Sequence, residues 1–516
     1  MGQGSRGMTS VATVADGFSL LEMAMAAADE TGVCRRPITM RVEDPATGIV
    51  RYVPAPCGNT LESQCPACAK RKCAIRIQQC REGWHMDAEP EIPDGPPVEL
   101  DGQTDLEEQE EQGQRRRRST RRRQDAPNLP RLKVENRTVG EVFAGKYQPG
   151  MFLTLTMPSY GPVHQDGAVN RKGEVCGDGS PIDPYSYDYP RAARDCIHFS
   201  RLFSRWVQNL RRAVGWNVQY FATVEPQRRG APHVHLLIRG AVTKEILRQV
   251  TAATYHQVWW PHHDVEVYGA GRMPVWDYDA KTFVDPDTRI PLPGWEQALD
   301  VMDSVDELEP AHVIRFGSQI KPKGILKGTP KADAAIGYLA KYLTKSVSEI
   351  LEPPNQRTAE HYDRLHAELL RTPCSDRCPV WLRYGIVPKG VGPKTHPGYC
   401  RGHAHQRDWL GVAGDRQKVS ERWTGKTMAD YKAERREFVR QLLDGAGIEQ
   451  PDTSGLIVTV VGPGDPAVPP REHLILAAIA QRTVWRVEYQ RVLEMLGPPE
   501  AQEDSATSSV PMEGEQ

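Results

Sequence analysis

The sequence of 516 residues lacks any apolar run approaching the ~20 residues that span a bilayer. We do not expect the short apolar segment 18–28 to be a signal peptide, because it contains Glu22 and follows no basic leader. Neither sign of charge is in excess: 65 lysines and arginines against 67 aspartates and glutamates give a net charge of −2, which indicates no class of partner. We therefore expect a cytoplasmic protein without a membrane partner, and the length suggests roughly three domains.

Charge is instead concentrated in one segment. Residues 105–111 are acidic, and residues 115–123 read Arg-Arg-Arg-Arg-Ser-Thr-Arg-Arg-Arg. Both runs lie within 87–130, which is rich in Pro, Gly, Gln and charge and has almost no large apolar side chains. We expect this segment to be a disordered linker, whose arginines either bind nucleic acid or only keep it soluble.

The eleven cysteines are unevenly spread, with nine in two clusters near the ends and only Cys176 and Cys196 between them. In a cytoplasmic protein such clusters indicate metal sites rather than disulfides, and ordinary buried thiols are the alternative. Cys65-Pro-Ala-Cys68 has the spacing of a zinc knuckle. The ligands that we assign to this first Zn²⁺ are Cys34, Cys57, Cys65 and Cys68. The competing ligands are Cys73, Cys80 and His85.

The second cluster lies in a region rich in Gly and Pro toward the C-terminus. Its predicted zinc ligands are Cys374, Cys378, Cys400 and His405. His403 is the alternative fourth ligand. Because protein side chains fill all four positions at each cluster, we expect two structural Zn²⁺ ions.

The middle of the chain has readable periodicities. Residues 151–157, 218–225 and 233–238 have the composition of strands. Between the first two, apolar residues from Phe199 to Leu210 recur with the spacing of an amphipathic helix. Strand, helix and strand hairpin together predict an α+β layer with a central antiparallel sheet and flanking helices.

The predicted strand 233–238 carries two histidines on one face. Because side chains alternate along a strand, His233 and His235 point the same way and can chelate one divalent ion. If the strand ending at Glu225 pairs antiparallel with it, that carboxylate reaches the same ion, and Gln227 is the alternative third ligand. Such a set suits Mg²⁺ or Mn²⁺. The alternative is that the two histidines are solvated and bind no metal. The pattern alone is not specific, because this chain contains a second His-x-His at 403–405.

A predicted helix that begins near residue 336 has two distinct faces. Its apolar stripe consists of Ile336, Leu339, Ala340, Leu343 and Val347. Its opposite stripe consists of Tyr338, Lys341, Tyr342 and Lys345. A phenol with its usual pKa near 10 is a poor nucleophile, and neighbouring ammonium groups favour the phenolate and neutralise charge on an attacked phosphate. The alternative is an amphipathic rim of tyrosines with lysines facing solvent.

These motifs, taken together, resemble the HUH endonucleases and, more narrowly, the rolling-circle replication initiators of actinomycete plasmids and integrative elements. The three principal matching motifs are Phe-Leu-Thr-Leu-Thr-Met-Pro-Ser at 152–159, Ala-Pro-His-Val-His at 231–235 and Tyr-Leu-Ala-Lys-Tyr-Leu-Thr-Lys at 338–345. Further resemblance lies in segments 118–125, 378–385 and 423–427, so it covers most of the chain.

The resemblance implies a metal-dependent nick in single-stranded origin DNA, a 5′-phosphotyrosyl intermediate and strand closure after one round of copying. We expect a host helicase and the replication machinery as further partners. In related initiators with one tyrosine the nucleophile falls at the second position, which implies Tyr342 here. Tyr338 is then a second nucleophile or an accessory residue. The competing functions are a conjugative relaxase or single-strand transposase of the same chemistry, and a non-catalytic zinc-containing DNA-binding protein.

The predicted organisation combines the α+β nuclease domain with two small zinc-binding modules and a helical tail, in which 428–443 and 472–496 have helical patterns. In order, we predict an N-terminal zinc-binding module (1–86), a disordered charged linker (87–130), an HUH nuclease domain (131–350), a C-terminal zinc-binding region (351–425) and a helical tail with a disordered end (426–516).

Overall fold

The computed structural model describes residues 19–90, 126, 128–140, 149–165, 177–269, 271–305, 308–341, 345, 347–414, 416–445, 447, 453, 455–462 and 465–496. Most of the predicted linker, Cys176, Tyr342, the side chain of Lys341 and the predicted disordered end lie outside these residues. The chain divides into two compact units, unit 1 with Met1–Arg71 and Lys426–Gln516, and unit 2 with Lys72–Gly425.

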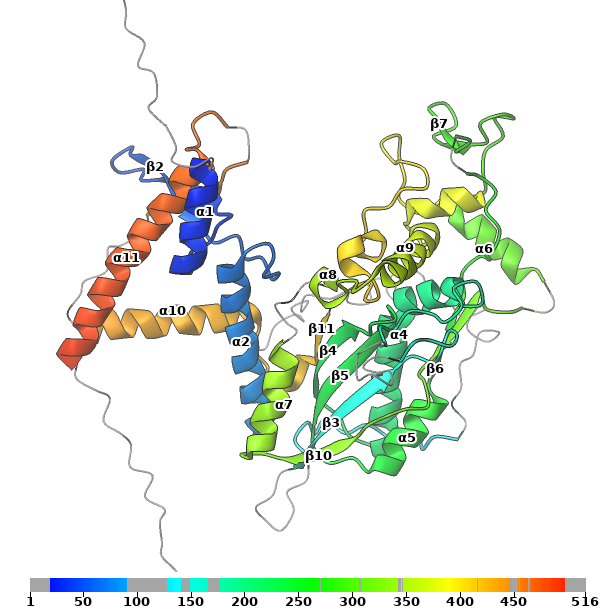
Figure 1. The fold of residues 1–516 in the computed structure, drawn as a ribbon, viewed down its shortest axis with the longest axis horizontal. Helices are drawn as coiled ribbons and strands as arrows, with labels where there is room; N and C mark the ends of the chain where they lie inside the picture. Colours follow the sequence, from blue (N-terminus) through cyan, green and yellow to red (C-terminus); the bar gives the residue numbers. More distant parts are fainter. Residues whose placement is uncertain are drawn as a thin grey trace, which may run out of the picture. The chain divides into compact units, whose positions relative to one another are not determined.

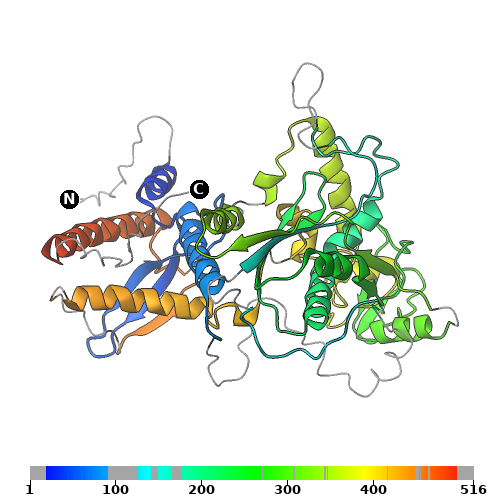
Figure 2. The same ribbon diagram turned by 90° about the horizontal axis from the view of Figure 1, so that it is seen from below.

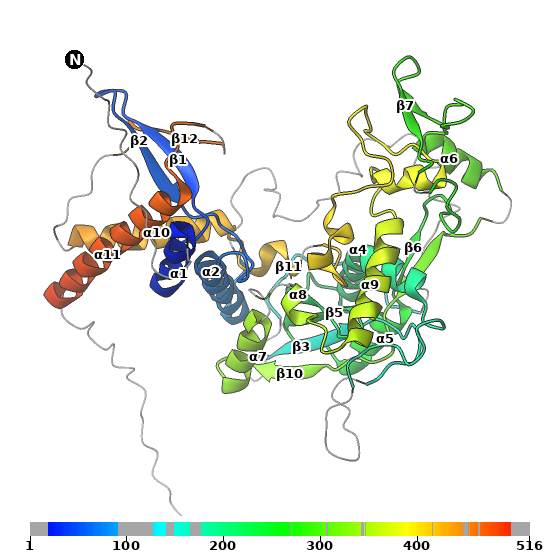
Figure 3. The same ribbon diagram turned by 45° about the horizontal axis from the view of Figure 1, so that its top comes forward.

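Unit 1 joins two distant parts of the chain in one antiparallel sheet of order β12-β1-β2 (Figure 3). Its strands are β1 (Ile38–Glu43), β2 (Val50–Ala55) and β12 (Ile457–Val460). Its helices are α1 (Leu20–Thr31), α10 (Met428–Gly445), α11 (Arg471–Leu496) and the first turn of α2 (Pro66–His85). The two predicted tail helices are therefore present. The domain boundaries predicted above separate 1–86 from 426–516, whereas the structure pairs strands from both parts.

The core of unit 1 is small. α1 begins with a capping box between Ser19 and Glu22. It packs against α11 through a cluster of buried small and branched side chains. These are Ala24, Ala28, Val33 and Ile475. So few apolar side chains contribute little burial energy, and the cysteine cluster described below has to supply further stability.

Unit 2 is built on a five-stranded antiparallel sheet of order β10-β3-β5-β4-β11 (Figure 1). Its strands are β3 (Pro149–Thr156), β4 (Tyr220–Pro226), β5 (Pro232–Arg239), β10 (Lys323–Leu326) and β11 (Gln417–Val419). The three predicted strands are β3, β4 and β5, and their antiparallel pairing confirms the expected α+β layer.

Helices cover both faces of this sheet (Figures 1 and 2). The helices of unit 2 are the rest of α2, α4 (Tyr189–Val214), α5 (Lys244–Ala253), α6 (Trp295–Asp303), α7 (Pro330–Lys341), α8 (Val347–Ile350) and α9 (Gln356–Arg371). Two short strand pairs complete it, β6 (Tyr255–Val258) with β9 (His312–Arg315) and β7 (Val275–Asp277) with β8 (Thr282–Val284). No helix among the described residues is long and apolar enough to cross a membrane.

The alternation of side chains along β5 assigns the histidines to one face. Val234, Leu236 and Ile238 are fully buried in a large core with α4, α5 and α9. Leu237 points the other way, into a smaller core with α7 and the end of α2. His233 and His235 share the face of Leu237, so they lie on the side of the sheet that α7 covers.

Candidate active site and metal centres

Glu225, His233 and His235 converge on one point of this face. The antiparallel register places Glu225 of β4 directly opposite His233 of β5, as the sequence predicts. The Nε2 atoms of the two histidines lie 2.8 Å apart, and Glu225 Oε2 lies 3.8 Å from one and 3.9 Å from the other. All three ligand atoms lie within 4.8 Å of one another, and this set can hold a metal ion.

Burial keeps both imidazoles available as ligands. It is the main cause that lowers the pKa of His233 to about 3 and that of His235 to about 4, and the neighbouring imidazole lowers that of His233 further. Both rings are therefore neutral at pH 7, with a lone pair on the unprotonated nitrogen. Together with the carboxylate of Glu225 they form a nitrogen and oxygen donor set that fits a divalent cation and leaves coordination positions open.

The orientation of His235 is fixed from β3. Thr154 lies directly opposite it, and its Oγ1 shares a 2.8 Å hydrogen bond with His235 Nδ1. When Nε2 is the ligand atom, Nδ1 carries the proton, and this N–H donates the hydrogen bond to Thr154 Oγ1. Phe152 stacks on the same ring, with centroids 5.9 Å apart. Neither contact is evident from the sequence, because both depend on the register of β3 against β5.

We expect Thr154→Val to weaken binding of Mn²⁺ about 10- to 100-fold, because the change removes the hydroxyl that orients the imidazole but keeps its shape. Thr154→Ser should restore the affinity. Thr223→Val is the matched control, since Thr223 also lies opposite His235 but its hydroxyl makes no hydrogen bond within the described residues. Calorimetric titration of the full chain measures all three. Wild-type affinity in Thr154→Val would show that the hydroxyl does not orient the ligand.

The alternative third ligand, Gln227, has other hydrogen-bond partners. It belongs to the turn between β4 and β5, where its N–H donates to the carbonyl of Ala231 and its side-chain oxygen accepts from Arg229 Nε. The carboxylate of Glu225 therefore meets the histidines, whereas the side-chain oxygen of Gln227 is engaged by Arg229 within the turn.

Helix α9 holds the turn that joins the two ligand strands. Tyr362 Oη donates to the carbonyl of Arg228 over 2.8 Å, and His361 Nε2 donates to that of Arg229 over 3.1 Å. Gly230 adopts φ 74°, a left-handed conformation that favours glycine. These contacts restrain the hairpin whose two arms carry Glu225 and His233. The role of α9 was not predicted, because no local pattern connects it to this turn.

α7 brings one of the predicted tyrosines to the cluster. Tyr338 Oη lies 3.3 Å from His235 Nε2, and the two rings meet edge to face with centroids 5.0 Å apart. Of the predicted apolar stripe, Ile336 and Leu339 are buried in the core below, whereas Leu343 lies outside the described residues. Tyr342 and the side chain of Lys341 lie outside the described residues.

Lys345 lies beside a cation that sequence reasoning missed. Arg416, the residue before β11, donates a hydrogen bond to the backbone carbonyl of Lys345. Burial lowers the pKa of Arg416, and the nearby carboxylates of Glu225 and Glu349 oppose that shift. A half-buried guanidinium thus lies in the field of the Glu225 carboxylate. A single arginine in a loop gives no signal in the sequence.

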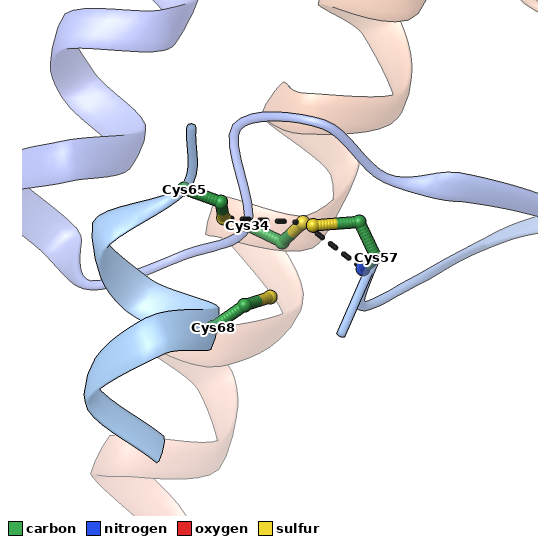
Figure 4. Close-up of side chains that lie close together, drawn as sticks. All are labelled: Cys34, Cys57, Cys65 and Cys68. Carbon is green, nitrogen blue, oxygen red and sulfur yellow. Dashed lines mark hydrogen bonds between the residues drawn. The ribbon is translucent and has the colours of Figure 1, made fainter. Parts of the chain in front are cut away.

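Four cysteines of unit 1 form a compact cluster (Figure 4). The side chains come from the segment after α1, the segment after β2 and the start of α2, and they are those of Cys34, Cys57, Cys65 and Cys68. Their sulfur atoms lie within 4.8 Å of one another, and hydrogen bonding, chiefly with Cys68, lowers the pKa of Cys34 to about 4. Four thiolates in this arrangement suit Zn²⁺. The competing Cys73, Cys80 and His85 do not belong to the cluster.

The second predicted cluster also assembles. Its members are Cys374, Cys378, Cys400 and His405, whose ligand atoms lie within 4.8 Å of one another. Burial tends to lower the pKa of His405, but hydrogen bonds with Cys378 and Cys400 raise it to about 9. The alternative ligand His403 instead stacks on Trp409, with centroids 4.2 Å apart. This donor set likewise suits Zn²⁺.

Comparison with known proteins adds the family. Residues 20–481 match the family model described as "Replication initiator protein, pSAM2". A replication initiator protein from Streptomyces ambofaciens is 34% identical over 111 residues, a match that covers 18% of this chain and 24% of that relative. No solved structure matches the chain. Because the family model spans most of the sequence, this chain belongs to the pSAM2 replication initiator family, RepSA.

Proposed function

We propose that this replication initiator nicks and rejoins single-stranded origin DNA through a 5′-phosphotyrosyl intermediate, with Mg²⁺ or Mn²⁺ held by Glu225, His233 and His235. The observation that carries the proposal is the convergence of these three ligand atoms within 4.8 Å, beside the hydroxyl of Tyr338. Membership of the replication initiator family supports this reading over a relaxase or a transposase.

The reaction needs a nucleophile, a proton acceptor and stabilised charge. Tyr342 gives up its phenolic proton to water, and the phenolate oxygen attacks the scissile phosphorus. The bond from phosphorus to the 3′ oxygen breaks, and that oxygen leaves as a 3′-hydroxyl after taking a proton. Lys341 and Lys345 favour the phenolate and neutralise charge on the phosphate. A bound divalent ion supplies a Lewis acid for the phosphate and the leaving oxygen. In closure a 3′-hydroxyl attacks the phosphotyrosine, which releases the phenol and restores the phosphodiester.

The two cysteine clusters complete the proposal as structural Zn²⁺ sites, since protein ligands fill every position. Single-stranded origin DNA is the proposed substrate. A host helicase is the proposed partner that unwinds the duplex after the nick.

Covalent attachment of the chain to labelled DNA tests the function. We expect the full chain to become linked to single-stranded oligonucleotides that tile its own replicon when Mn²⁺ or Mg²⁺ is added. The adduct migrates with the protein on a denaturing gel. The double variant His233→Ala, His235→Ala should lose the adduct and keep its zinc, because neither residue belongs to a cysteine cluster. Absence of any adduct from the wild-type chain across all oligonucleotides would refute the proposed chemistry.

A further inference from the structure

Positively charged side chains outnumber negatively charged ones in the segment around the second cysteine cluster. Residues 371–409 contain seven lysines and arginines but only two aspartates and no glutamate, although acidic and basic residues balance in the whole chain. A local excess of this kind repels itself unless carboxylates elsewhere in the fold, or a partner, neutralise it.

Four of the seven cations have carboxylate partners within unit 2. Arg371 and Arg383 both lie near Glu266, at 3.5 Å and 3.6 Å. Lys389 lies 3.1 Å from Glu296 and 3.5 Å from Asp376, and Arg407 lies 3.2 Å from Asp363. These four side chains connect the segment to its surroundings, so their charge is already balanced.

The other three cations point to solvent. Arg377, Lys394 and Arg401 are exposed, and their side chains form no ion pair or hydrogen bond with any described residue. Arg377 immediately precedes Cys378, and Arg401 immediately follows Cys400. Because those cysteines belong to one cluster with ligand atoms within 4.8 Å, both arginines adjoin the same cluster.

An exposed aromatic ring lies between these cations in the sequence. Tyr399, beside Cys400, has 57% of its surface exposed. A phenol ring with arginine and lysine around it is the combination that binds nucleic acid. The cations contact phosphates, and the ring stacks on an unpaired base.

We propose that Arg377, Lys394, Tyr399 and Arg401 form a DNA-binding surface on the C-terminal cysteine cluster, separate from the proposed nicking site. The three cations contact the phosphate backbone, which single-stranded and duplex DNA share, and Tyr399 stacks only where a base is unpaired. The inference rests on DNA being the substrate under the proposed function. It predicts a role for the second cluster, which presents the surface to DNA rather than taking part in the chemistry.

The salt dependence of binding tests this surface. We expect the double variant Arg377→Gln, Arg401→Gln to bind DNA with a weaker dependence on salt. The magnitude of the slope of log affinity against log salt should fall by about 1.4 on single strands or about 1.8 on duplex, since two phosphate contacts are lost. The measurement is fluorescence anisotropy of matched single-stranded and duplex oligonucleotides with the full chain. Added Mg²⁺ and Mn²⁺ are omitted, so the result does not depend on nicking. The form of DNA on which the slope falls is the form that this surface binds.

Matched variants separate a DNA contact from a general effect. Arg377→Lys, Arg401→Lys should keep the wild-type slope, because both charges remain. Lys244→Gln, Arg248→Gln on α5 removes the same charge from exposed residues elsewhere and should also keep it. Tyr399→Ala should weaken binding about tenfold on single strands and not on duplex.

The surface is refuted if the glutamine pair keeps the wild-type slope on both forms of DNA. It is refuted equally if the α5 control or the lysine pair loses as much slope as the glutamine pair. Bound zinc, measured in every variant, confirms that the cluster is intact. A wild-type chain that binds DNA through this surface but forms no covalent adduct would instead contradict the proposed nicking function alone.

Discussion

Tyr342→Phe should abolish the covalent adduct with single-stranded DNA while binding of the same DNA remains. Phenylalanine keeps the ring and removes the oxygen that we assign to the attack, so the rate of adduct formation should fall by on the order of a thousandfold or more. Denaturing gels with labelled oligonucleotide measure the adduct, and anisotropy without added divalent ion measures binding. Retained binding shows that the loss is chemical.

Tyr338→Phe is the matched control, because it removes the same atom four residues earlier in the sequence. Its ring packs edge to face against both Phe152 and His235, and phenylalanine keeps those contacts. We expect this variant to form the first adduct and to be slower in the closing transfer. The opposite pattern, with the adduct lost in Tyr338→Phe and kept in Tyr342→Phe, would exchange the two roles. Because the Tyr338 hydroxyl lies 3.3 Å from His235 Nε2, Tyr338 is also a candidate for the first attack, and the comparison of the two variants tests which tyrosine makes it.

The part of the site that sequence reasoning predicted depends on local patterns. His233 and His235 share a face because side chains alternate on a strand, and the short turn after Glu225 fixes the register of the hairpin. The zinc knuckle at Cys65 and Cys68 is likewise a local spacing. The choice among competing zinc ligands came from composition, and the structure brings together the predicted set at each cluster.

The remaining features arise from contacts between distant segments. Val42 of β1 lies opposite Val458 of β12. The two residues lie near opposite ends of the sequence, so no local spacing indicates that they pair. The hydrogen bond from His235 to Thr154 depends on a register between strands joined by a long connection. Arg416 gives no pattern at all, because an isolated arginine is ordinarily a solvated surface residue.

Cys65→Ser should remove one of two zinc ions and unfold unit 1. Cys65 is fully buried, and among the described residues Ala67 is the one member of its hydrophobic cluster besides the four cysteines. A structural zinc ion contributes about 10–16 kcal/mol of apparent binding free energy, which is comparable with the about 5–15 kcal/mol that stabilises a whole domain. The second core of this unit, around Ala28 and Ile475, is too small to compensate. Elemental analysis and limited proteolysis measure the two effects.

Cys73→Ser provides the control for this prediction, since Cys73 lies on the same helix α2 but outside the cluster. Its thiol hydrogen bonds to the carbonyl of Ala340, and a serine hydroxyl can make the same bond. This variant should keep both zinc ions and the protease resistance of unit 1. Retention of both ions in Cys65→Ser, or loss of one in Cys73→Ser, would contradict the assigned ligands. The free energy of zinc binding is part of the free energy of folding. Loss of zinc from Cys65→Ser must therefore appear as unfolding and not only as a lower metal content.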